Sequence, residues 1–521
     1  MSLLGIDVGT SGAKAVLFSE TGAVLARAYH EYSFTSPETG RYEMDPDRVW
    51  NAVAAAVREV NATDAAGRDP ASALAVSASG DEFVLVDRAG RCLHPVLMSM
   101  DARGRREAAW LERRLGRELI FRLTGLPLSP KYGLCRMLWY RRNRPEAWAL
   151  AWKCLTWEEF VHLRLGVDPV SDPSSVARLM VLDISTGRLA EEVLAVAGIE
   201  AGRIAEFVPS GTPIGFLPAE SAASLGFRRR AAVVTGGFDQ AMACLGSGCV
   251  AAGQAMVGTG TMEALGVVAS PETTAQALAS RTAGGVYPWG PHVVPGLYLC
   301  TATNTGGGLV VRWYRDAFGQ PAGDPGDVDG GGGGGYDALL AEACDEPTDL
   351  LFLPHLAGSG PPHRDGDSLG ALVGLEARTS RGEVVKALLE GITYELRQNL
   401  DRLREAGLMV STLTASGGGS RSDRWLQLKA DVTGVPIRRA WVPEAGCAGA
   451  AVLAGVGSGV YSDLTEAVRT LVRLDGVFEP DAARHAAYGE RYALYVKLYP
   501  ALKTILHGLH DLRRPPKEGT K

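Results

Sequence analysis

The sequence has no excess of basic residues. It contains 53 Lys and Arg against 59 Asp and Glu, which gives a formal net charge of -6. A surface for nucleic acid or for an anionic membrane needs clustered Lys and Arg, so this balance argues against both classes of partner. It does not argue against a nucleotide, because local backbone N–H groups and a metal ion can hold phosphates.

Paired cysteines and long apolar runs are also missing. None of the eight cysteines forms a C-x-x-C pair, and no His or Cys cluster has zinc spacing. Scattered cysteines in a chain of this length indicate free thiols in a reducing compartment. No apolar run reaches the ~18 residues that suggest a membrane span, and the N-terminus has no basic segment followed by an apolar one. We therefore expect a cytoplasmic protein.

The length of 521 residues exceeds what one hydrophobic core supports, so two large domains are expected. Similar orders of elements occur twice, which indicates a weak internal duplication of an α/β domain, and the first copy has the order β-β-β-α-β, a meander followed by a crossover. In each copy, a strand ends in a Gly-Thr turn and a second strand hairpins back. The first copy has strands at 3–7, 13–18, 23–32 and 74–78 with a helix at 46–60; the second has strands at 254–257, 262–268 and 297–302 with a helix at 309–318.

Two further stretches predict opposite kinds of structure, a long helix and a flexible loop. The segment from Ser380 to Gly407 predicts a long helix, with Ser380 and Glu383 as a capping box and Gly407 as its stop. The stretch from Ala322 to Gly335 has six consecutive glycines and predicts a flexible loop, which we interpret as an inert insertion. The tail after Arg513 is expected to fray. The apolar stripe of the long helix consists of Val385, Leu388, Leu389, Ile392, Leu396, Leu400 and Leu403.

None of the Gly-rich turns that follow strands matches a complete phosphate-binding fingerprint, neither G-x-x-x-x-G-K-[ST] nor G-x-G-x-x-G. The sequence has three Gly-rich turns that directly follow strands. In the first, Gly9, Thr10 and Ser11 let the backbone wrap phosphate oxygens and add hydroxyl donors, and Lys14 adds a positive charge. Asp7, at the end of the strand, is a candidate to hold Mg²⁺ through water.

The other two turns have the same small residues. The second contains Gly258 and Thr259, and the third contains Gly417, Gly418 and Gly419, where a strand meets a helix beginning at Asp423. A nucleotide can approach the backbone closely at such turns. A single Gly-rich turn of this kind is more often a purely structural hairpin than a phosphate site; the combination in this order is more specific.

A fourth feature is the sequence Gly236-Gly237-Phe238-Asp239-Gln240, which directly follows a strand predicted at 232–235. A carboxylate presented by a glycine pair at the end of a strand suits a general base for a hydroxyl nucleophile. The alternative is that Asp239 forms an Asx-turn or N-cap for a helix that begins near Gln240.

Taken together, these motifs resemble the FGGY carbohydrate kinases of the sugar kinase and actin-like superfamily, from Leu3 to about Tyr488. The resemblance implies two ribonuclease-H-like (actin-like ATPase) domains, at 1–248 and 249–521, with an interdomain cleft. It further implies ATP and Mg²⁺ as cofactors, with Asp239 as the base that takes a proton from a substrate hydroxyl. The matching segments are Gly5–Ser11, Arg136–Trp139, Gly236–Gln240, Val257–Gly260, Gly370–Leu375 with Leu389–Gly391, Ala415–Ser422 and Glu444–Ala451.

The departures from the family pattern concern the substrate. Arg136 stands where a Lys is usual, and Ser99 replaces a common Trp. The segment Ser79–Glu82 differs from both xylulose and glycerol kinases, and other segments resemble glycerol kinases or fuculose kinases, so no single sugar is implied. Candidate substrate contacts are Asp81, Glu82, Asp101 and Gln240; for Asp81 and Glu82, a solvated loop is the alternative.

Three functional classes remain to be compared. The motifs favour a kinase for a small sugar or polyol, such as a ketopentose (pentulose) or ketohexose, with the N-terminal domain holding the sugar and the C-terminal domain the nucleotide. A catalytically silent, sugar-sensing member is the alternative, which loss of Asp7, Thr10 or Asp239 would favour, and none of these residues is lost. An actin-like ATPase with a protein partner would lack Asp239. Homo-oligomers are common in the resembling family, so a homodimer is one expected state.

Overall fold

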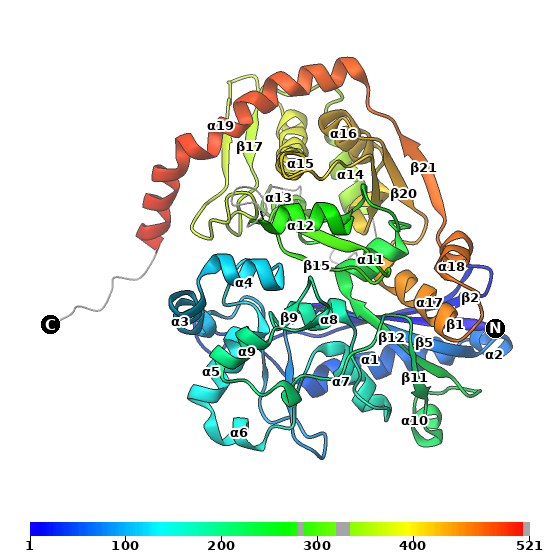
Figure 1. Ribbon diagram of the computed structural model, residues 1–521. Helices are drawn as coiled ribbons and strands as arrows, with labels where there is room; N and C mark the ends of the chain where they lie inside the picture. The colour runs from blue at the N-terminus through cyan, green and yellow to red at the C-terminus, as the bar shows by residue number, and fades with distance from the viewer. Residues whose placement is uncertain (280–285, 319–333, 514–521) are drawn as a thin grey trace. The chain divides into compact units, whose positions relative to one another are not determined.

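The computed structural model describes residues 1–279, 286–318 and 334–513 of the chain (Figure 1). The contacts divide the chain into two compact units, and neither is continuous in sequence. The single domain boundary after residue 248, which we expected from the sequence, therefore stays a proposal. The first unit comprises Met1–Ala252, Val268–Cys300 and Glu444–Arg473; the second comprises Gly253–Val267, Thr301–Pro443 and Leu474–Lys521.

The first unit is built on a six-stranded sheet with the order β11-β12-β5-β1-β2-β3. The first three strands along the chain form an antiparallel meander, and β5 and β12 then add in parallel beside β1. All three parallel strands are almost continuously apolar, as strands buried on both faces are. The strands are β1 (Ser2–Val8), β2 (Gly12–Ser19), β3 (Val24–Glu31), β5 (Ala71–Ala78), β11 (Pro213–Phe216) and β12 (Ala232–Phe238).

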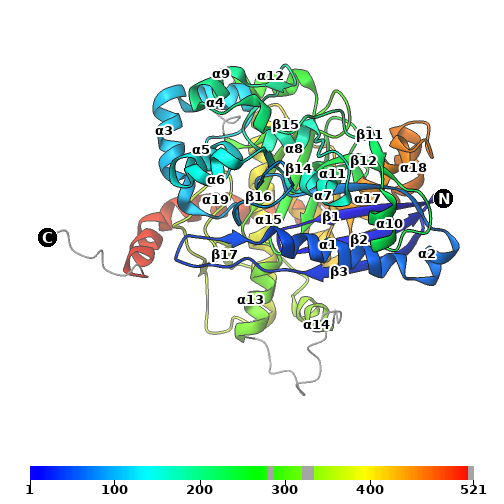
Figure 2. The same cartoon turned by 90° about the horizontal axis from the view of Figure 1, so that it is seen from below.

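Helices cover both faces of this sheet. Helix α1 (Pro46–Asn61) packs Val49 and Val53 into the same core cluster as Ile6 of β1. Helix α17 (Ala445–Gly457) lies against β1 from the side of Gly5, the residue before Ile6. Because neighbouring residues of a strand point to opposite faces, α1 and α17 cover opposite sides of β1. Figure 2 shows both helices beside the strands of this sheet.

The approach of α17 to β1 depends on the absence of a side chain at Gly5. A Cβ atom built at Gly5 would lie 1.9 Å from the carbonyl oxygen of Cys447. That oxygen belongs to the helix backbone and has no rotamer by which to move away. The whole of α17 would have to shift to make room.

We therefore expect Gly5→Ala to destabilise the protein by about 1–3 kcal/mol through overpacking. Urea or guanidinium denaturation measures the change in the free energy of unfolding. A suitable control is Gly489→Ala, because a Cβ at this helical glycine meets nothing within 4 Å; that change should be neutral or slightly stabilising. An unaltered midpoint for Gly5→Ala would contradict the close contact.

The second unit repeats the strand order of the first. In its larger sheet the order β16-β14-β13-β19-β20-β21 matches β3-β2-β1-β5-β12-β11, with β14 antiparallel to β13 and with β19 and β20 parallel to it. The predicted duplication thus appears in the topology. The strands are β13 (Gln254–Thr259), β14 (Glu263–Ala269), β16 (Tyr298–Asn304), β19 (Thr412–Ser416), β20 (Ile437–Ala440) and β21 (Leu474–Phe478).

The longest predicted helix is confirmed as α15 (Arg381–Glu405). Its capping box is complete, since Ser380 Oγ accepts from the backbone N–H of Glu383 at 3.3 Å and Glu383 accepts from the N–H of Ser380 at 2.7 Å. All seven residues of the predicted apolar stripe are buried. The other helices of the second unit are α13 (Gly308–Phe318), α14 (Gly334–Glu342), α16 (Asp423–Thr433) and α19 (Ala482–Arg513).

The predicted glycine loop lies mostly outside the described residues, as does the tail after Arg513. Gly334 and Gly335, which we expected in the loop, begin α14 instead.

Within the described ranges, no helix combines the length and the apolar character of a membrane span. The remaining elements are β4 (Glu43–Met44), α2 (Asp64–Arg68), β6 (Val84–Val86), β7 (Val96–Leu97), η1 (Ala102–Gly104), α3 (Arg105–Leu115), α4 (Arg117–Thr124), α5 (Gly133–Asn143), α6 (Pro145–Leu150), β8 (Lys153–Leu155), α7 (Trp157–Leu165), α8 (Pro173–Arg178), β9 (Leu182–Asp183), β10 (Arg188–Leu189), α9 (Glu191–Ala197), η2 (Ala201–Arg203), α10 (Ala219–Ser224), α11 (Asp239–Gly246), α12 (Pro271–Ala279), β15 (Trp289–Pro291), β17 (Leu351–Leu353), β18 (Ala371–Val373), η4 (Gly418–Arg421) and α18 (Leu464–Leu471).

Candidate active site

The carboxyl ends of β1, β5 and β12 bring the acidic residues of the first unit together. Asp7 of β1 pairs in register with Ser77 of β5, and Ser77 pairs with Gly237 of β12. Asp239 follows two residues later. Ser77 Oγ donates to Asp7 Oδ1 at 2.7 Å, which fixes one oxygen of this carboxylate and leaves the other available.

A bulge in β12 directs the chain toward Asp239. The pairing with β5 shifts register between Val234 and Gly237, so two backbone N–H groups need partners outside the ladder. The N–H of Gly236 donates to Glu158 Oε1 at 2.8 Å, and the N–H of Phe238 donates to Ser174 Oγ at 3.0 Å. A Cβ at Gly236 would lie 1.9 Å from the carbonyl oxygen of Val76, so the bulge requires glycine here.

Asp239 is the first residue of α11, and Phe238 occupies the N-cap position without a side-chain cap bond. The alternative of an Asp239 N-cap is therefore not what the structure shows. Among the described residues, Asp239 Oδ1 is buried with no hydrogen-bond partner. Burial raises the pKa of Asp239 to about 8; Asp7 and Asp81 also raise it, and Arg178 lowers it. A carboxyl group in this state is suited to proton transfer near neutral pH.

Asp81 is neutralised by two cations. Arg178 donates to Asp81 Oδ1 through Nε at 2.9 Å and Nη2 at 2.6 Å, and Lys131 Nζ lies 3.0 Å from Oδ2. Burial alone would raise the pKa of Asp81, but Arg178 and Lys131 outweigh it and lower the pKa to about 2. The solvated-loop alternative does not describe Asp81, which is an ion-paired residue beside Asp239. Arg178 also stacks over the rings of Phe238 and Tyr132.

Three further residues were predicted to contact the substrate. Two of them already have hydrogen-bond or ion-pair partners in the protein, and the third follows Asp239 in the chain. Glu82 is buried, accepts from Ser79 Oγ at 2.7 Å and accepts from the N–H of Ser99 at 2.9 Å. Asp101 is buried and forms an ion pair with Arg103 at 2.7 Å. Gln240 follows Asp239 in the first turn of α11 and is partly exposed.

The first Gly-rich turn joins β1 to β2. The N–H of Gly9 donates to the carbonyl of Gly12 at 3.1 Å, and the hydroxyl of Tyr32 donates to the carbonyl of Gly9 at 2.5 Å. Thr10 and Ser11 are both exposed at its tip. Lys14 stands opposite Asp7 in the β1–β2 register. Although burial lowers the pKa of Lys14, Asp7 and other neighbours raise it above its ordinary value, so Lys14 is a cation.

The N-terminus of α17 adds a positive electrostatic end to this site. A Cβ at Gly446 would lie 2.7 Å from Asp7 Oδ1 and 2.9 Å from Ser77 Oγ. The first turn of a helix of 13 residues therefore touches the Asp7 carboxylate. Unpaired N–H groups at a helix N-terminus favour anions such as carboxylates and phosphates.

In the second unit, two of the predicted turns line one cavity of about 330 Å³. Gly417 has a φ of +78°, and a Cβ at Gly419 would lie 2.7 Å from the Thr259 Cβ, so the turns approach each other through glycine. Gly258 lies in β13, paired with Ser416, and contributes to the strand. The lining residues are Thr259, Gly260, Thr261, Gly308, Val311, Arg312, Leu340, Gly418, Gly419, Arg421, Ser422 and Trp425.

The cavity combines an apolar wall with cations. Val311, Leu340 and Trp425 offer a surface for a flat ring, and Arg312 and Arg421 supply charges for phosphates. Sequence reasoning located the glycines but missed these five side chains. Helical periodicity marks Val311 and Trp425 as core residues, and no local signal distinguishes core residues from cavity walls.

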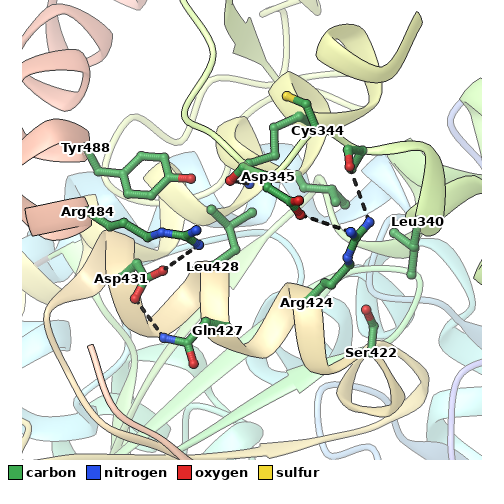
Figure 3. Close-up of a pocket in the computed structure, with 13 residues that line it drawn as sticks. Leu340, Cys344, Asp345, Ser422, Arg424, Gln427, Leu428, Asp431, Arg484 and Tyr488 are labelled. Carbon is green, nitrogen blue, oxygen red and sulfur yellow. Dashed lines mark hydrogen bonds and ion pairs between the residues drawn. The ribbon is translucent and has the colours of Figure 1, made fainter. Parts of the chain in front are cut away.

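A smaller cavity of about 100 Å³ adjoins the larger one, and the two share Leu340 and Ser422 (Figure 3). Four of its charged residues form two ion pairs. Arg424 lies 2.9 Å from Asp345, and Arg484 lies 3.9 Å from Asp431. These pairs connect α16 to the segment after α14 and to α19, so we interpret this cavity as a structural contact between elements and not as a binding site.

A magnesium ion fits the residues of the first unit. Mg²⁺ is usually held by one or two carboxylates together with substrate phosphates and water. Asp7 supplies a carboxylate beside the first Gly-rich turn, and only one of its oxygens accepts from Ser77. Within the described part of the chain, no group of three or more His, Cys, Asp or Glu residues could hold a metal ion without such help.

Comparison with solved structures supports the same architecture. A structure described as a xyloylose kinase from Brucella ovis matches with a TM-score of 0.83 at 28% identity, covering 97% of this chain and 100% of that one. The glycerol kinase of Plasmodium falciparum, solved with ADP, matches with a TM-score of 0.81 at 20% identity, covering 95% of this chain and 97% of that one. The two actin-like ATPase domains expected from the sequence are thus confirmed.

Sequence comparison identifies the family. Residues 2–246 match the N-terminal domain and residues 255–458 the C-terminal domain of the FGGY family of carbohydrate kinases. The xylulose kinase of Escherichia coli is 27% identical, covering 96% of this chain and 99% of the relative; the glycerol kinase of Bordetella parapertussis is 30% identical, covering 89% and 90%. The chain belongs to the FGGY family and is a carbohydrate kinase.

Proposed function

We propose that this kinase transfers the γ-phosphoryl group of MgATP to a hydroxyl of a small sugar or polyol, with Asp239 as the general base. The observation that carries the proposal is the Asp239 carboxyl itself. Asp239 directly follows the bulged strand β12, has a buried oxygen without a partner among the described residues, and has a pKa raised to about 8. A base with such a pKa accepts a hydroxyl proton without being permanently ionised.

The nucleotide supplies the phosphoryl group, and the chain supplies positions and charges for it. We assign the 330 Å³ cavity to the nucleoside, with Gly417, Gly418 and Gly419 beside it and Thr259 at the phosphate end. The Gly9–Ser11 turn and Lys14 would meet phosphate oxygens from the first unit, with Asp7 holding Mg²⁺. In phosphoryl transfer, such positioning and charge stabilisation provide most of the catalysis.

For the acceptor, we propose Asp81, Lys131, Tyr132 and Gln240 as contacts. The Lys131 side chain is 34% exposed. Its ammonium group has three N–H donors, so it can bind a substrate hydroxyl while it remains paired with Asp81. The Tyr132 hydroxyl is buried and has no partner within the described residues. Glu82 and Asp101, whose carboxylates already accept hydrogen bonds inside the protein, would stabilise their own segments and would not bind the acceptor directly.

A coupled ADP-release assay tests the function. We would supply MgATP with a panel of ketopentoses, 6-deoxyketohexoses, ketohexoses, pentitols, tetritols and glycerol. Turnover with one class supports the proposal and names the acceptor. If no compound is phosphorylated while ADP still binds in calorimetry, the silent sugar-sensing alternative gains support; if ADP does not bind either, the assignment of the nucleotide cavity is wrong.

The nucleotide assignment has a test of its own at Gly418. A Cβ at this position meets nothing within 4 Å, so Gly418→Val should leave stability unchanged and yet project into the space assigned to the nucleoside. We expect the Kd for ADP to rise at least about tenfold, which corresponds to about 1.4 kcal/mol. Gly366→Ala, at another glycine with open space, is the control. Equal ADP affinity in both variants would argue against this cavity.

A further inference from the structure

A fully buried ion pair lies directly behind Thr259 in the second unit. Lys429 of α16 and Glu263 of β14 are each only 1% exposed, and Lys429 Nζ contacts Glu263 Oε2. Glu263 stands opposite Thr259 in the β13–β14 register. Thr259 lines the larger cavity, whereas Lys429 and Glu263 do not.

The hydroxyl of Thr259 is enclosed by this pair. Lys429 Nζ donates to Thr259 Oγ1 at 2.6 Å, and Thr259 Oγ1 donates to Glu263 Oε2 at 2.9 Å. A threonine hydroxyl has one hydrogen and two lone pairs. Its hydrogen is used by Glu263, so the hydroxyl has none left to donate to a phosphate oxygen. Thr259 therefore presents its backbone and methyl group to the cavity.

Stability alone does not account for the pair. Removing two charges from water costs several kcal/mol per ion, and the attraction between them often does no more than compensate. What the pair does accomplish is to connect three elements. Thr259 ends β13, Glu263 begins β14, and Lys429 lies on α16 with its Nζ 4.8 Å from the centre of the Trp425 ring. Trp425 is itself a wall of the cavity.

The turn between Thr259 and Glu263 has further fixed points. The N–H of Gly260 donates to the carbonyl of Met262 at 2.9 Å, and the N–H of Gly308 donates to the carbonyl of Gly260 at 2.8 Å. The start of α13 therefore holds one side of the turn. Lys429 and Glu263 hold the other side, so the turn cannot rotate without breaking charged hydrogen bonds.

We propose that Lys429 and Glu263 are positioning residues that fix Thr259, and with it the second Gly-rich turn, in the conformation that receives the phosphate end of a nucleoside triphosphate. The inference rests on the proposed nucleotide role of this cavity. Preorganised backbone donors act most strongly when they need not rearrange during the reaction. Loosening the turn should therefore affect kcat more than it affects the binding of ADP.

A double variant separates positioning from stability. Lys429→Met alone would leave the charge of Glu263 buried without a partner and would weaken the fold. Lys429→Met/Glu263→Leu removes both charges and keeps similar volumes. The matched control is Arg424→Met/Asp345→Leu, which removes an exposed ion pair from the same helix, with side chains 53% and 71% exposed.

We would measure Tm, the Kd for ADP by calorimetry, and kcat and the KM for ATP. The double variant should keep its Tm within a few degrees and its ADP affinity within about threefold, and its kcat should fall at least about tenfold. The control should match the wild type in all four quantities. Wild-type kcat in the double variant would overturn the inference; wild type that binds no ADP would instead overturn the proposed function.

Variants of Thr259 provide a second, independent test. Thr259→Ser keeps the hydroxyl and should retain activity, whereas Thr259→Val removes both hydrogen bonds and should show the kcat loss of the double variant. If the hydroxyl were a direct phosphate ligand, Thr259→Val would weaken ADP binding, whereas a positioning role predicts lower kcat with ADP affinity within about threefold of the wild type. Weakened ADP binding in Thr259→Val would therefore contradict a positioning role, even if the double variant proved too unstable to assay.

Discussion

Replacing Asp239 with asparagine should lower kcat for the phosphorylated acceptor by about 10²- to 10⁴-fold, the usual contribution of a general base. Asparagine keeps the shape of the side chain but cannot accept the proton. The burial that raises the pKa of Asp239 also means that the neutral amide should be well tolerated. The ADP-release assay gives kcat, and calorimetry with ADP checks that the nucleotide site is intact.

The same carboxyl group predicts the pH dependence. Because the pKa of Asp239 is raised to about 8 in the protein without nucleotide or metal, the base is mostly protonated at pH 7. The quantity kcat/KM at low ATP should therefore rise with pH and level off above about pH 8. Asp7→Asn would remove a neighbouring negative charge and lower the pKa of Asp239, so the ascending limb of the kcat/KM profile should move to lower pH. An Asp239→Asn variant with near wild-type kcat would exclude Asp239 as the base.

The second large effect is expected for Arg178→Met. Arg178 forms two hydrogen bonds to Asp81 and lowers the pKa of Asp239. Without it, Asp81 keeps Lys131 as its one close cation, and the free energy of unfolding should fall by about 3 kcal/mol, at the low end for breaking a buried ion pair. The pKa of Asp239 should rise further, so the ascending limb of kcat/KM should move to higher pH and activity at pH 7 should fall.

A compensating change separates these two consequences. Asp81 raises the pKa of Asp239 while Arg178 lowers it. In Arg178→Met/Asp81→Asn the two influences are removed together, so stability should recover and the limb should return toward its wild-type position. Denaturant titration and the pH profile of kcat/KM measure these quantities. A pH profile that does not move in Arg178→Met would show that the guanidinium does not act on Asp239.

The sequence predicted those parts of the fold that depend on local patterns. Periodicity located α1 and α15, the Ser380 capping box was found from two residues, and Gly-rich turns located the ends of β1, β13 and β19. Asp239 was found because the glycine pair before it is a local signal. The start of α14 at Gly334 was not predicted, since glycine disfavours helix and packing against neighbouring helices outweighs that preference.

The side chains that support the site were not predictable in this way. Glu158 and Ser174 reach β12 from 78 and 64 residues away, and Lys429 reaches Thr259 from 170 residues away. Nothing in their own neighbourhoods marks them, because their role comes from tertiary contacts. The family resemblance likewise placed Glu82 and Asp101 among the candidate substrate contacts. Their bonds to Ser79, Ser99 and Arg103 become visible only when the chain is folded.

The late position of α17 in the chain has a consequence for biosynthesis. This helix covers the Gly5 face of β1, yet its last residue is Gly457, so a ribosome exposes the first strands long before their cover exists. A nascent chain that stops after Ala252 holds β1, β5 and β12 with one apolar face open to solvent. Such a fragment should bind chaperones or aggregate. The first unit should thus acquire its native structure only after most of the second has been translated.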